Sequence, residues 1–334
     1  MNAETAGREA DRGDLTVDET GLVARYFAGI GPLREDVRLG IGDDAALLRP
    51  GPGRELVLTT DSLVEGAHFL PEADPRSLGH RALAVNLSDV AAMGGEPCWA
   101  LLSLTLPAVE PAWLEAFSAG FGALLREHGV ALAGGNLARG PLNIGVQLCG
   151  QIPAGRGLTR SGARGGELLC VSGTPGDAGA GRQALGGPPG PDRVARDALR
   201  ARFEFPAARV GLGLRLRELA TACIDISDGL WRDLQRLTQA SGCGATVVAE
   251  DLPLSPALRA AAGEQALHYA LHGGEDYELL FTIPAGSRAA LQEAARSSGT
   301  SCTVIGHCEA TPELWLQRAG VRQSPSAAGF DHFR

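Results

Sequence analysis

Hydrophobic and polar positions follow two periods along the first half of the chain. Strand-like patterns occupy residues 55–63 (ELVLTTDSL), 99–106, 130–135 and 142–150 (LNIGVQLCG). Residues 76–95 carry apolar positions at helical spacing and end at a Gly-Gly pair, and residues 111–129 form a second helical pattern that Gly129 closes. This alternation of strands and helices predicts a first α/β unit.

A turn-rich segment at 158–167 separates this unit from a second one. The expected elements of the second unit are a strand at 168–173, a helix near 209–220, a strand and then a helix within 223–242, a strand at 278–283 and a helix near 287–297. Residues 173–192 are rich in glycine and proline and are expected to form a mobile loop. The predicted organisation is a mobile tail at 1–15, a domain at 16–150 and a domain at 151–334.

Length and composition fit this division. A chain of 334 residues with 44% hydrophobic and 5% aromatic residues suits two α/β (α+β) domains. Its seven cysteines form no CxxC pair, so neither a disulfide framework nor a zinc ribbon is indicated. No apolar run approaches the length of a membrane span, and the start is polar and acidic, unlike a targeting peptide. We therefore expect a cytoplasmic protein without a membrane partner.

The charge balance excludes several function classes. The net charge of −9 argues against a nucleic-acid partner, because such affinity comes mostly from phosphate neutralisation by basic residues. All 30 basic residues are arginine. Walker-A kinases, protein kinases and Schiff-base enzymes all need a lysine, so these classes are excluded.

Two adjacent carboxylates, Asp43 and Asp44, lie between apolar residues in the segment GIGDDAALL. Two like charges about 4 Å apart repel by roughly 4 kcal/mol at an effective dielectric constant of about 20. A partly buried pair therefore needs a cation, a proton or ample water. Taken alone, the pair fits a solvated turn better than a binding site.

Other acidic residues recur near the predicted ends of elements. Asp61 follows Thr59 and Thr60 at an expected strand end, and these side chains are hard oxygen ligands. Asn86 and Asp89 are three residues apart in an apolar helix, so they share a face that should be buried, where a charge needs a partner.

The segment IDISDGL places Asp225 at a predicted strand end, Ser227 as the N-cap of the next helix and Asp228 in its first turn. A capping motif explains Ser227 and Asp228 but leaves Asp225 without a role. Glycine pairs in GGNLARG (134–140) and GGEDYELLF (273–281) would let backbone amides approach a phosphate, although a single Gly-Gly is usually only a turn.

Six aspartates thus lie near element ends with no lysine to balance them: Asp43, Asp44, Asp61, Asp89, Asp225 and Asp228. The sequence predicts that several Mg²⁺ ions balance them, because Mg²⁺ prefers carboxylates, waters and substrate phosphates. No HExxH motif or His/Cys cluster offers zinc or iron instead. By composition alone, His68 in EGAHFL fits a packed core histidine better than a ligand.

Eight ordered segments together resemble the thiamine-monophosphate kinases, a family of the aminoimidazole-ribonucleotide synthetase superfamily: GIGDDAALL, TTDSLVEGAHF, AVNLSDVAAMGG, LTRSGA, SGTPGD, IDISDGL, GGEDYELLFT and GFDHF. The match extends from about residue 20 to residue 333. The resemblance implies the two-domain architecture of that superfamily and a homodimer formed through the N-terminal domains. It also implies ATP-dependent phosphorylation of thiamine monophosphate with Mg²⁺.

The resemblance also implies roles for individual residues. The implied ligands of Mg²⁺ and its bridged phosphates are Asp44, Thr59, Thr60, Asp61, Asp89, Asn136, Asp225 and Asp228, of which Asp61, Asp89 and Asp228 are the catalytic candidates. The implied ATP contacts are Gly135, Asn136, Arg160 and Ser227. The implied contacts to thiamine phosphate are His68, Glu275 and Phe330. We expect direct transfer, since no histidine or cysteine has a convincing nucleophile setting.

Four positions depart from the family pattern. Asn136 replaces a common aspartate, which should weaken a metal contact there but leave a carbonyl oxygen, and Leu137 replaces a hydroxyl residue. Phe205 and Ala208 replace an arginine and a proline ahead of Arg209, which puts a phosphate-contacting role of this segment in doubt.

Two alternatives stay open from the residues. A sister enzyme could use the same ATP site to activate an amide, a carboxamide or selenide, although the aromatic segments EGAHF and GFDHF suit a cationic ring better. The chain could also be a non-catalytic, acidic metal-binding scaffold. An assay of ATP consumption separates these alternatives.

Overall fold

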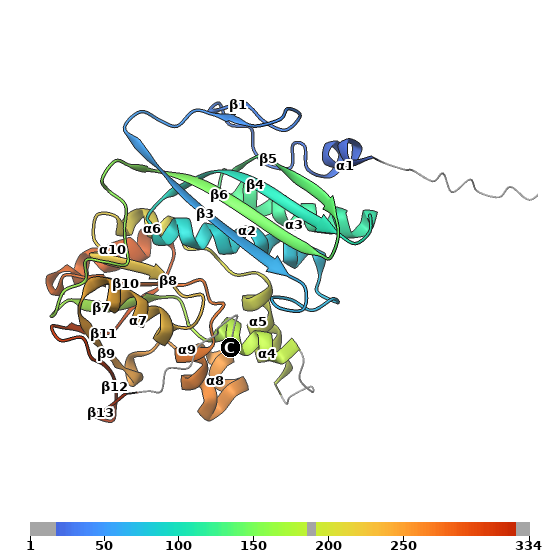
Figure 1. Cartoon of the computed structure of the whole chain (residues 1–334). Helices are drawn as coiled ribbons and strands as arrows, with labels where there is room; N and C mark the ends of the chain where they lie inside the picture. Colours follow the sequence, from blue (N-terminus) through green and yellow to red (C-terminus); the bar gives the residue numbers. More distant parts are fainter. Residues whose placement is uncertain (1–17, 186–191, 325–334) are drawn as a thin grey trace, which may run out of the picture.

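The computed structural model describes residues 18–185 and 192–324, which form two sheets with helices between and around them (Figure 1). The expected tail at 1–15 lies outside the described residues. Among the described residues, no helix combines the length and apolar character needed to cross a membrane. All seven cysteines are described and none is in a disulfide.

The N-terminal sheet has four strands in the order β3–β6–β4–β5. Its strands are β3 (Arg54–Val64), β4 (Glu96–Leu106), β5 (Ala131–Arg139) and β6 (Asn143–Pro153). The pairing of β4 with β5 is parallel and the other pairings are antiparallel. Helices α2 (Pro75–Ala92) and α3 (Pro111–Glu127) pack beneath the sheet, while β1 (Val37–Leu39), β2 (Leu47–Leu48) and α1 (Glu19–Tyr26) lie beyond its other side and edge (Figure 1).

The register of β3 decides which of its side chains face the helices. Asp61 is paired with Val146, which is fully buried in the core, whereas Thr60 is paired with the exposed Gln147. Successive side chains point to opposite faces of a strand. Asp61 and Thr59 therefore face α2, and Thr60 faces outward. The expectation that these residues end the strand was wrong, because the pairing with β6 continues to Val64.

Helix α2 confirms the helix predicted from residue 76. It begins with Asp74 as N-cap and Pro75 in its first turn, and nearly all of its side chains are buried. It is buried on so many sides because it packs against the N-terminal sheet on one side and against α6 (Val210–Leu216) and β8 (Ala222–Asp225) of the second domain on the other (Figure 1). Polar side chains on α2 are therefore held at the domain interface.

The second sheet has seven strands in the order β13–β12–β9–β11–β7–β10–β8. These are β7 (Leu168–Ser172), β8 (Ala222–Asp225), β9 (Gly244–Val248), β10 (Leu279–Ile283), β11 (Cys302–Glu309), β12 (Leu314–Arg318) and β13 (Val321–Gln323). Only β12 and β9 pair in parallel among the described strands of this sheet. The two sheets therefore offer no edge of parallel strands at which all the motif residues could meet.

Helices cover this second sheet and link it to the first domain. They are α4 (Asp177–Leu185), α5 (Arg193–Glu204), α6 (Val210–Leu216), α7 (Leu230–Ser241), α8 (Pro256–Ala262), α9 (Ala266–His272) and α10 (Arg288–Ser298), with short 3-10 turns η1 (Ala249–Asp251), η2 (Gly263–Gln265) and η3 (Ala285–Ser287). Strand β6 ends at Pro153, so the first sheet extends three residues past the expected boundary at 150.

The prediction of one long loop at 173–192 was wrong. Helix α4 occupies residues 177–185 of that segment. The buried carboxylate of Asp276 accepts hydrogen bonds from the backbone amides of Gly176 (2.7 Å) and Ala178 (3.1 Å), which satisfies donors at the start of the helix. The sequence pattern missed this helix because its cap is supplied by a residue about a hundred positions away.

Candidate active site

Three aspartates from three elements meet at the domain interface. Asp61 comes from β3, Asp89 from α2 and Asp225 from the end of β8. Asp89 interacts with Asp61 by a side-chain hydrogen bond and accepts a second from the Thr59 hydroxyl at 2.5 Å. Ser88 donates a hydrogen bond to the buried Asp225 carboxylate at 2.8 Å. These three carboxylates are electrostatic neighbours in the fold, and their role as ligands of Mg²⁺ stays a prediction.

Burial raises the pKa of each of these carboxyls, and neighbouring carboxylates add to the rise for Asp61 and Asp225. Withdrawal from water, the charge of Asp89 and the hydrogen bond to it raise the pKa of Asp61 to about 7. Burial, with Asp89 as the next cause, raises the pKa of Asp225 to about 8. Burial also raises the pKa of Asp89, although Thr59 and Arg160 act in the opposite direction. These carboxyls therefore keep their protons to a higher pH than ordinary aspartates do, unless another cation replaces the protons.

These carboxylates and hydroxyls fit an open type of Mg²⁺ site. In the described part of the chain, no three carboxylate, imidazole or thiol side chains are placed to hold one ion by themselves. Mg²⁺ commonly takes only one or two protein carboxylates and completes its shell with water and substrate phosphates. A crowded carboxylate cluster with raised pKa values and hydroxyl neighbours fits such an open site, and not a closed protein cage.

The loop after β8 differs from its sequence prediction. Ser227 is not the N-cap and Asp228 is not in the first helical turn, because α7 begins at Leu230 with Gly229 as its N-cap. Instead, the fully buried Asp233 of the first turn accepts hydrogen bonds from the backbone amides of Ser227 (3.1 Å) and Asp228 (3.0 Å). Asp233 of the helix therefore fixes the conformation of the loop, and the side chains of Ser227 and Asp228 lie at the edge of a cavity.

The loop GGEDYE packs directly on this segment. The amides of Glu275 and Tyr277 donate to the carbonyls of Ser227 (2.8 Å) and Ile226 (2.9 Å), and both residues have a positive φ, of 63° and 51°. Such a left-handed backbone is unfavourable for non-glycine residues and persists only where the surroundings fix it. The two loops thus form one rigid wall of the site.

The Glu275 carboxylate is already paired in this wall. Arg81 of α2 donates to it at 2.6 Å, and the Tyr277 hydroxyl donates at 3.0 Å. Arg81 also donates to the His68 carbonyl at 2.8 Å, so its buried guanidinium joins the His68 loop to the GGEDYE loop. Much of the negative charge of Glu275 is therefore neutralised within the protein.

A cavity of about 140 Å³ brings together residues from both predicted sets. Its lining includes Asp61, His68, Ser227, Asp228 and Glu275. His68 is half-buried here, and its Nδ1 accepts a hydrogen bond from the Val64 amide at 3.0 Å. His68 is therefore a cavity-lining residue, which differs from the packed core histidine that composition favours.

Three further predicted residues have different outcomes. Arg160, expected to contact ATP, is near enough to Asp89 to lower the pKa of that carboxyl against the effect of burial. Asp228 forms an ion pair with Arg236 at 2.6 Å. Phe330, expected to contact thiamine phosphate, lies outside the described residues.

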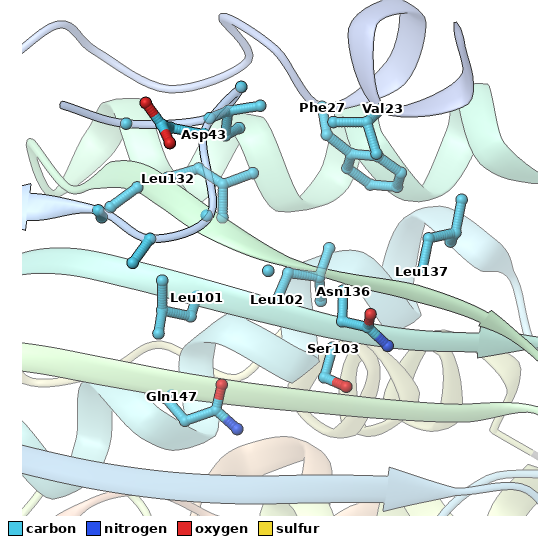
Figure 2. A pocket seen from close by; sticks show the side chains of 18 of the residues that line it. Val23, Phe27, Asp43, Leu101, Leu102, Ser103, Leu132, Asn136, Leu137 and Gln147 are labelled. Atoms are coloured by element: carbon cyan, nitrogen blue, oxygen red, sulfur yellow. The ribbon is translucent and has the colours of Figure 1, made fainter. Parts of the chain in front are cut away.

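The remaining predicted residues lie on the opposite side of the N-terminal sheet. Asp44 and Asn136 line a separate cavity of about 700 Å³, with Asp43, Ser103 and Gln147 (Figure 2). The Asp43 carboxylate accepts a hydrogen bond from the Asp44 amide at 2.8 Å, as in an exposed turn. Within one chain, the structure does not bring this group, or the outward-facing Thr60, to the Asp61 cluster.

Gly135 has a structural reason to be glycine. A Cβ there would lie 2.0 Å from the Leu102 carbonyl oxygen of the neighbouring strand, so only glycine allows β5 to pair closely with β4. The glycine pair predicted as a phosphate contact thus serves the sheet, although Gly135 also lines the 700 Å³ cavity.

The segment with departures from the family pattern is held internally. Arg209 and Arg202 both pair with the fully buried Glu278, the latter at 2.7 Å. Phe205 packs edge-on against His80, with ring centroids 5.3 Å apart. Arg209 is therefore committed to a structural ion pair and is not directed at the Asp61 cluster.

Three residues of the site were missed by sequence reasoning: Arg81, Asp233 and Ser88. A signal existed for Arg81, because it is a charged residue on a helix expected to be buried. Asp233 and Ser88 carried no such signal, since acidic residues in first turns and serines in helices are common.

Comparison with known proteins defines the class first. The family model described as AIR synthase related protein, N-terminal domain, matches residues 42–152, and the corresponding C-terminal model matches residues 164–317. The chain is therefore a two-domain member of the aminoimidazole-ribonucleotide synthetase superfamily, as its motifs predicted.

Within this superfamily, the chain belongs to the thiamine-monophosphate kinase family. It is 46% identical to the thiamine-monophosphate kinase of Salmonella typhimurium over 96% of this chain and 99% of the relative, and 38% identical to that of Haemophilus influenzae over the same shares. The crystal structure of the thiamine-monophosphate kinase of Stenotrophomonas maltophilia K279a aligns with a TM-score of 0.80 at 44% identity, covering 86% of this chain and 92% of the other. The structure described as AaThiL complexed with AMPPCP and TMP aligns with a TM-score of 0.76 at 36% identity, covering 88% and 92%.

Proposed function

We propose that this protein transfers the γ-phosphoryl group of ATP to thiamine monophosphate, giving thiamine diphosphate. The observation that carries the proposal is the cluster of Asp61, Asp89 and Asp225 with raised pKa values, in a chain that belongs to the thiamine-monophosphate kinase family. A structural relative is described in complex with an ATP analogue and TMP, which supports the same pair of substrates here.

Phosphoryl transfer to a phosphate requires mainly that the protein neutralises charge and positions the two substrates. A phosphate acceptor has a low pKa and needs no strong general base, so in-line positioning of two polyanions dominates. Bound Mg²⁺ would supply the charge neutralisation for which other kinases use a lysine. Asp61, Asp89 and Asp225 would hold it, while the Asp233-shaped loop keeps Ser227 and Asp228 at the cavity and Arg160 adds positive charge beside Asp89.

A direct assay tests this proposal. Purified protein with ATP and Mg²⁺ is offered thiamine, thiamine monophosphate or aminoimidazole ribonucleotide, and products are separated by chromatography. We expect thiamine diphosphate and ADP from thiamine monophosphate only, because thiamine has no anion for the metal site to position. Phosphorylation of thiamine, or ATP consumption with aminoimidazole ribonucleotide alone, would overturn it.

The sister-enzyme alternative has fold-level support only. Hydrogenase maturation protein HypE in complex with ATP aligns with a TM-score of 0.73 at 20% identity, which shows a shared fold and no more. The same assay decides between the two.

We further propose that Asp44, Gly135 and Asn136 act on the nucleotide side, and that Phe330 contacts the thiazolium ring. Asp44→Asn should raise KM for ATP and leave KM for thiamine monophosphate unchanged. Phe330→Ala should do the reverse, with an increase of about 2-fold to 30-fold, the range that a cation–π contact of roughly 0.5 to 2 kcal/mol corresponds to. Equal weakening of both substrates by Phe330→Ala would identify the ring as a packing residue.

Exposed leucines on the outer face of the N-terminal sheet support a homodimer formed through that sheet. Leu56 and Leu58 of β3 are 48% and 73% exposed, and Leu101 of β4 is 39% exposed on the same face. A row of exposed leucines on a sheet is typical of a protein interface. Leu58→Arg should give monomers by light scattering, whereas Val321→Arg on β13, also strongly exposed, should leave the assembly unchanged.

A further inference from the structure

Arg236 of α7 bridges two aspartates beside the loop that precedes this helix. Its Nη2 lies 2.6 Å from Oδ2 of Asp228, and its Nη1 donates to Oδ1 of Asp233 at 2.7 Å. Asp233 is fully buried, whereas the side chains of Arg236 and Asp228 are 35% and 23% exposed. One guanidinium therefore joins a carboxylate fixed inside the protein to a carboxylate that water can reach.

The two aspartates differ in how firmly they are held. The Asp233 carboxylate also accepts hydrogen bonds from the backbone amides of Ser227 and Asp228, so its position is fixed from several directions. Asp228 lines the cavity of about 140 Å³ together with Asp61, whereas Arg236 is not part of that lining. Asp228 is therefore the partner whose carboxylate can turn from the guanidinium to a cation in the cavity while the loop keeps its conformation.

We propose that Arg236 is an internal counter-ion that pairs with Asp228 while no metal is bound and releases it when Mg²⁺ arrives with the substrate phosphates. The inference rests on the proposed function, because it requires Mg²⁺ at this site, and it deepens that function by naming the residue that competes with the metal. Arg236 keeps its pair with Asp233 throughout, so it can take Asp228 back when the metal leaves.

The charges and the exposure of the pair favour such an exchange. A partly exposed ion pair contributes little to stability, so breaking it costs little. Mg²⁺ carries twice the charge of a guanidinium and prefers carboxylate and phosphate oxygens. Arg232 adds a more distant positive charge, with its Nε 4.0 Å from Oδ2 of Asp228. In a chain without lysine, arginines of α7 thus balance Asp228 before the metal binds.

Competition and simple structural support predict opposite signs for the loss of Arg236. If its guanidinium competes with the metal, removal of that charge makes metal binding tighter. If its guanidinium only holds Asp228 in place, removal disorders a ligand and makes metal binding weaker. The direction of the change in metal affinity therefore decides between the two roles.

The test measures metal binding without turnover. Wild-type protein and Arg236→Gln are titrated with Mn²⁺ in the presence of ADP, and free Mn²⁺ is followed by its electron paramagnetic resonance signal. We expect Arg236→Gln to bind Mn²⁺ about 2-fold to 5-fold more tightly, as for a weak ion pair that no longer has to be broken. The Mg²⁺ concentration for half-maximal activity should fall by the same factor. Arg236→Lys keeps the charge and should bind Mn²⁺ less tightly than Arg236→Gln.

Control variants separate an effect at Asp228 from a general change of charge. Arg296→Gln is the matched control, because Arg296 of α10 forms an exposed pair with Glu293 at 2.7 Å with the same spacing of three residues, and its loss should leave Mn²⁺ affinity unchanged. If Arg236→Gln does not fold, Arg236→Met keeps the apolar stem and has the same expected result. In the Asp228→Asn background, Arg236→Gln should no longer tighten Mn²⁺ binding, because the carboxylate for which the two cations compete is gone.

Failure of this inference is distinguishable from failure of the proposed function. A wild-type protein that never phosphorylates thiamine monophosphate overturns the proposed function, while the Mn²⁺ titration still tests Arg236. A wild-type protein that forms thiamine diphosphate, with an Arg236→Gln variant that binds Mn²⁺ equally or more weakly, overturns the competition alone. Tightening that persists in the Asp228→Asn background, or that appears equally in Arg296→Gln, would also overturn it.

Discussion

Ser88 of α2 donates a hydrogen bond to Asp225 of β8 at 2.8 Å, and both residues are buried where the two domains meet. Ser88 precedes Asp89 in the chain, so the same turn of α2 carries one member of the acidic cluster, Asp89, and contacts another, Asp225. The bond lowers the pKa of Asp225 against the larger, raising effect of burial.

Ser88→Ala should therefore weaken Mg²⁺ activation. Without the hydroxyl, the pKa of Asp225 rises further, and an incoming cation must displace a more tightly held proton. We expect a several-fold higher Mg²⁺ concentration for half-maximal activity and a loss of about 1–3 kcal/mol in unfolding free energy. Ser118→Ala, on the half-exposed side of α3, is the matched control. An unchanged Mg²⁺ titration would argue that Asp225 holds no metal.

Asp61→Asn should abolish turnover and leave the fold intact. The substitution removes a metal ligand, for which a loss of about 10³-fold or more corresponds to several kcal/mol of transition-state stabilisation. It also removes one of two adjacent carboxyls, so the metal-free protein should be as stable as the wild type or more stable. Asp89→Asn should behave alike, and the exposed Asp251→Asn should not affect turnover. An unfolded Asp61 variant, or one with near-normal turnover, would support a purely structural role.

The metal-free protein should lose stability as the pH rises. The folded-state pKa values of Asp61 and Asp225, about 7 and about 8, lie above the ordinary value of 3.8. The folded state thus keeps protons that the unfolded state releases, and this stabilisation is fully present below the unfolded pKa and lost through the folded pKa. Tm without metal should fall between about pH 4 and about pH 8, and added Mg²⁺ should raise Tm more at the upper end. A Tm increment from Mg²⁺ that is the same at every pH would contradict the assignment.

Asp233 should act by positioning the loop before α7. Its carboxylate accepts from two backbone amides of that loop and pairs with Arg236 at 2.7 Å. Asp233→Ala leaves these donors unpaired, and we expect kcat to fall about 10-fold to 100-fold, as for other residues that orient metal ligands. Asp233→Asn keeps an oxygen for the amides and should restore part of the activity. A variant pair with equal activities, both stable by thermal denaturation, would refute the positioning role.

The sequence by itself determined the local elements and the family. The helix from residue 76, the helix at 111–129 and the strand at 55–63 follow from periodicity, because a local hydrophobic pattern fixes how each segment must present its apolar face. The ordered motifs identified the thiamine-monophosphate kinase family without any knowledge of contacts. Turn and cap assignments were less certain, and Ser227 and the segment at 177–185 were assigned wrongly because their partners are Asp233 and Asp276.

Only the tertiary structure decided which of the marked residues meet. Asp61 and Asp89 come together because a strand and a helix pack face to face. Asp225 comes from the second domain, 137 positions after Ser88 in the chain. Arg81 pairs with Glu275 across 194 positions, so the Glu275 carboxylate already has a partner within the protein. Thr60 carries the same chemistry as Thr59 but faces the other side of the sheet, because strand register allots neighbouring residues to opposite faces. Asp44 lies on that other side because it belongs to the turn between β1 and β2. Local periodicity specifies faces, and long-range packing specifies which faces come together.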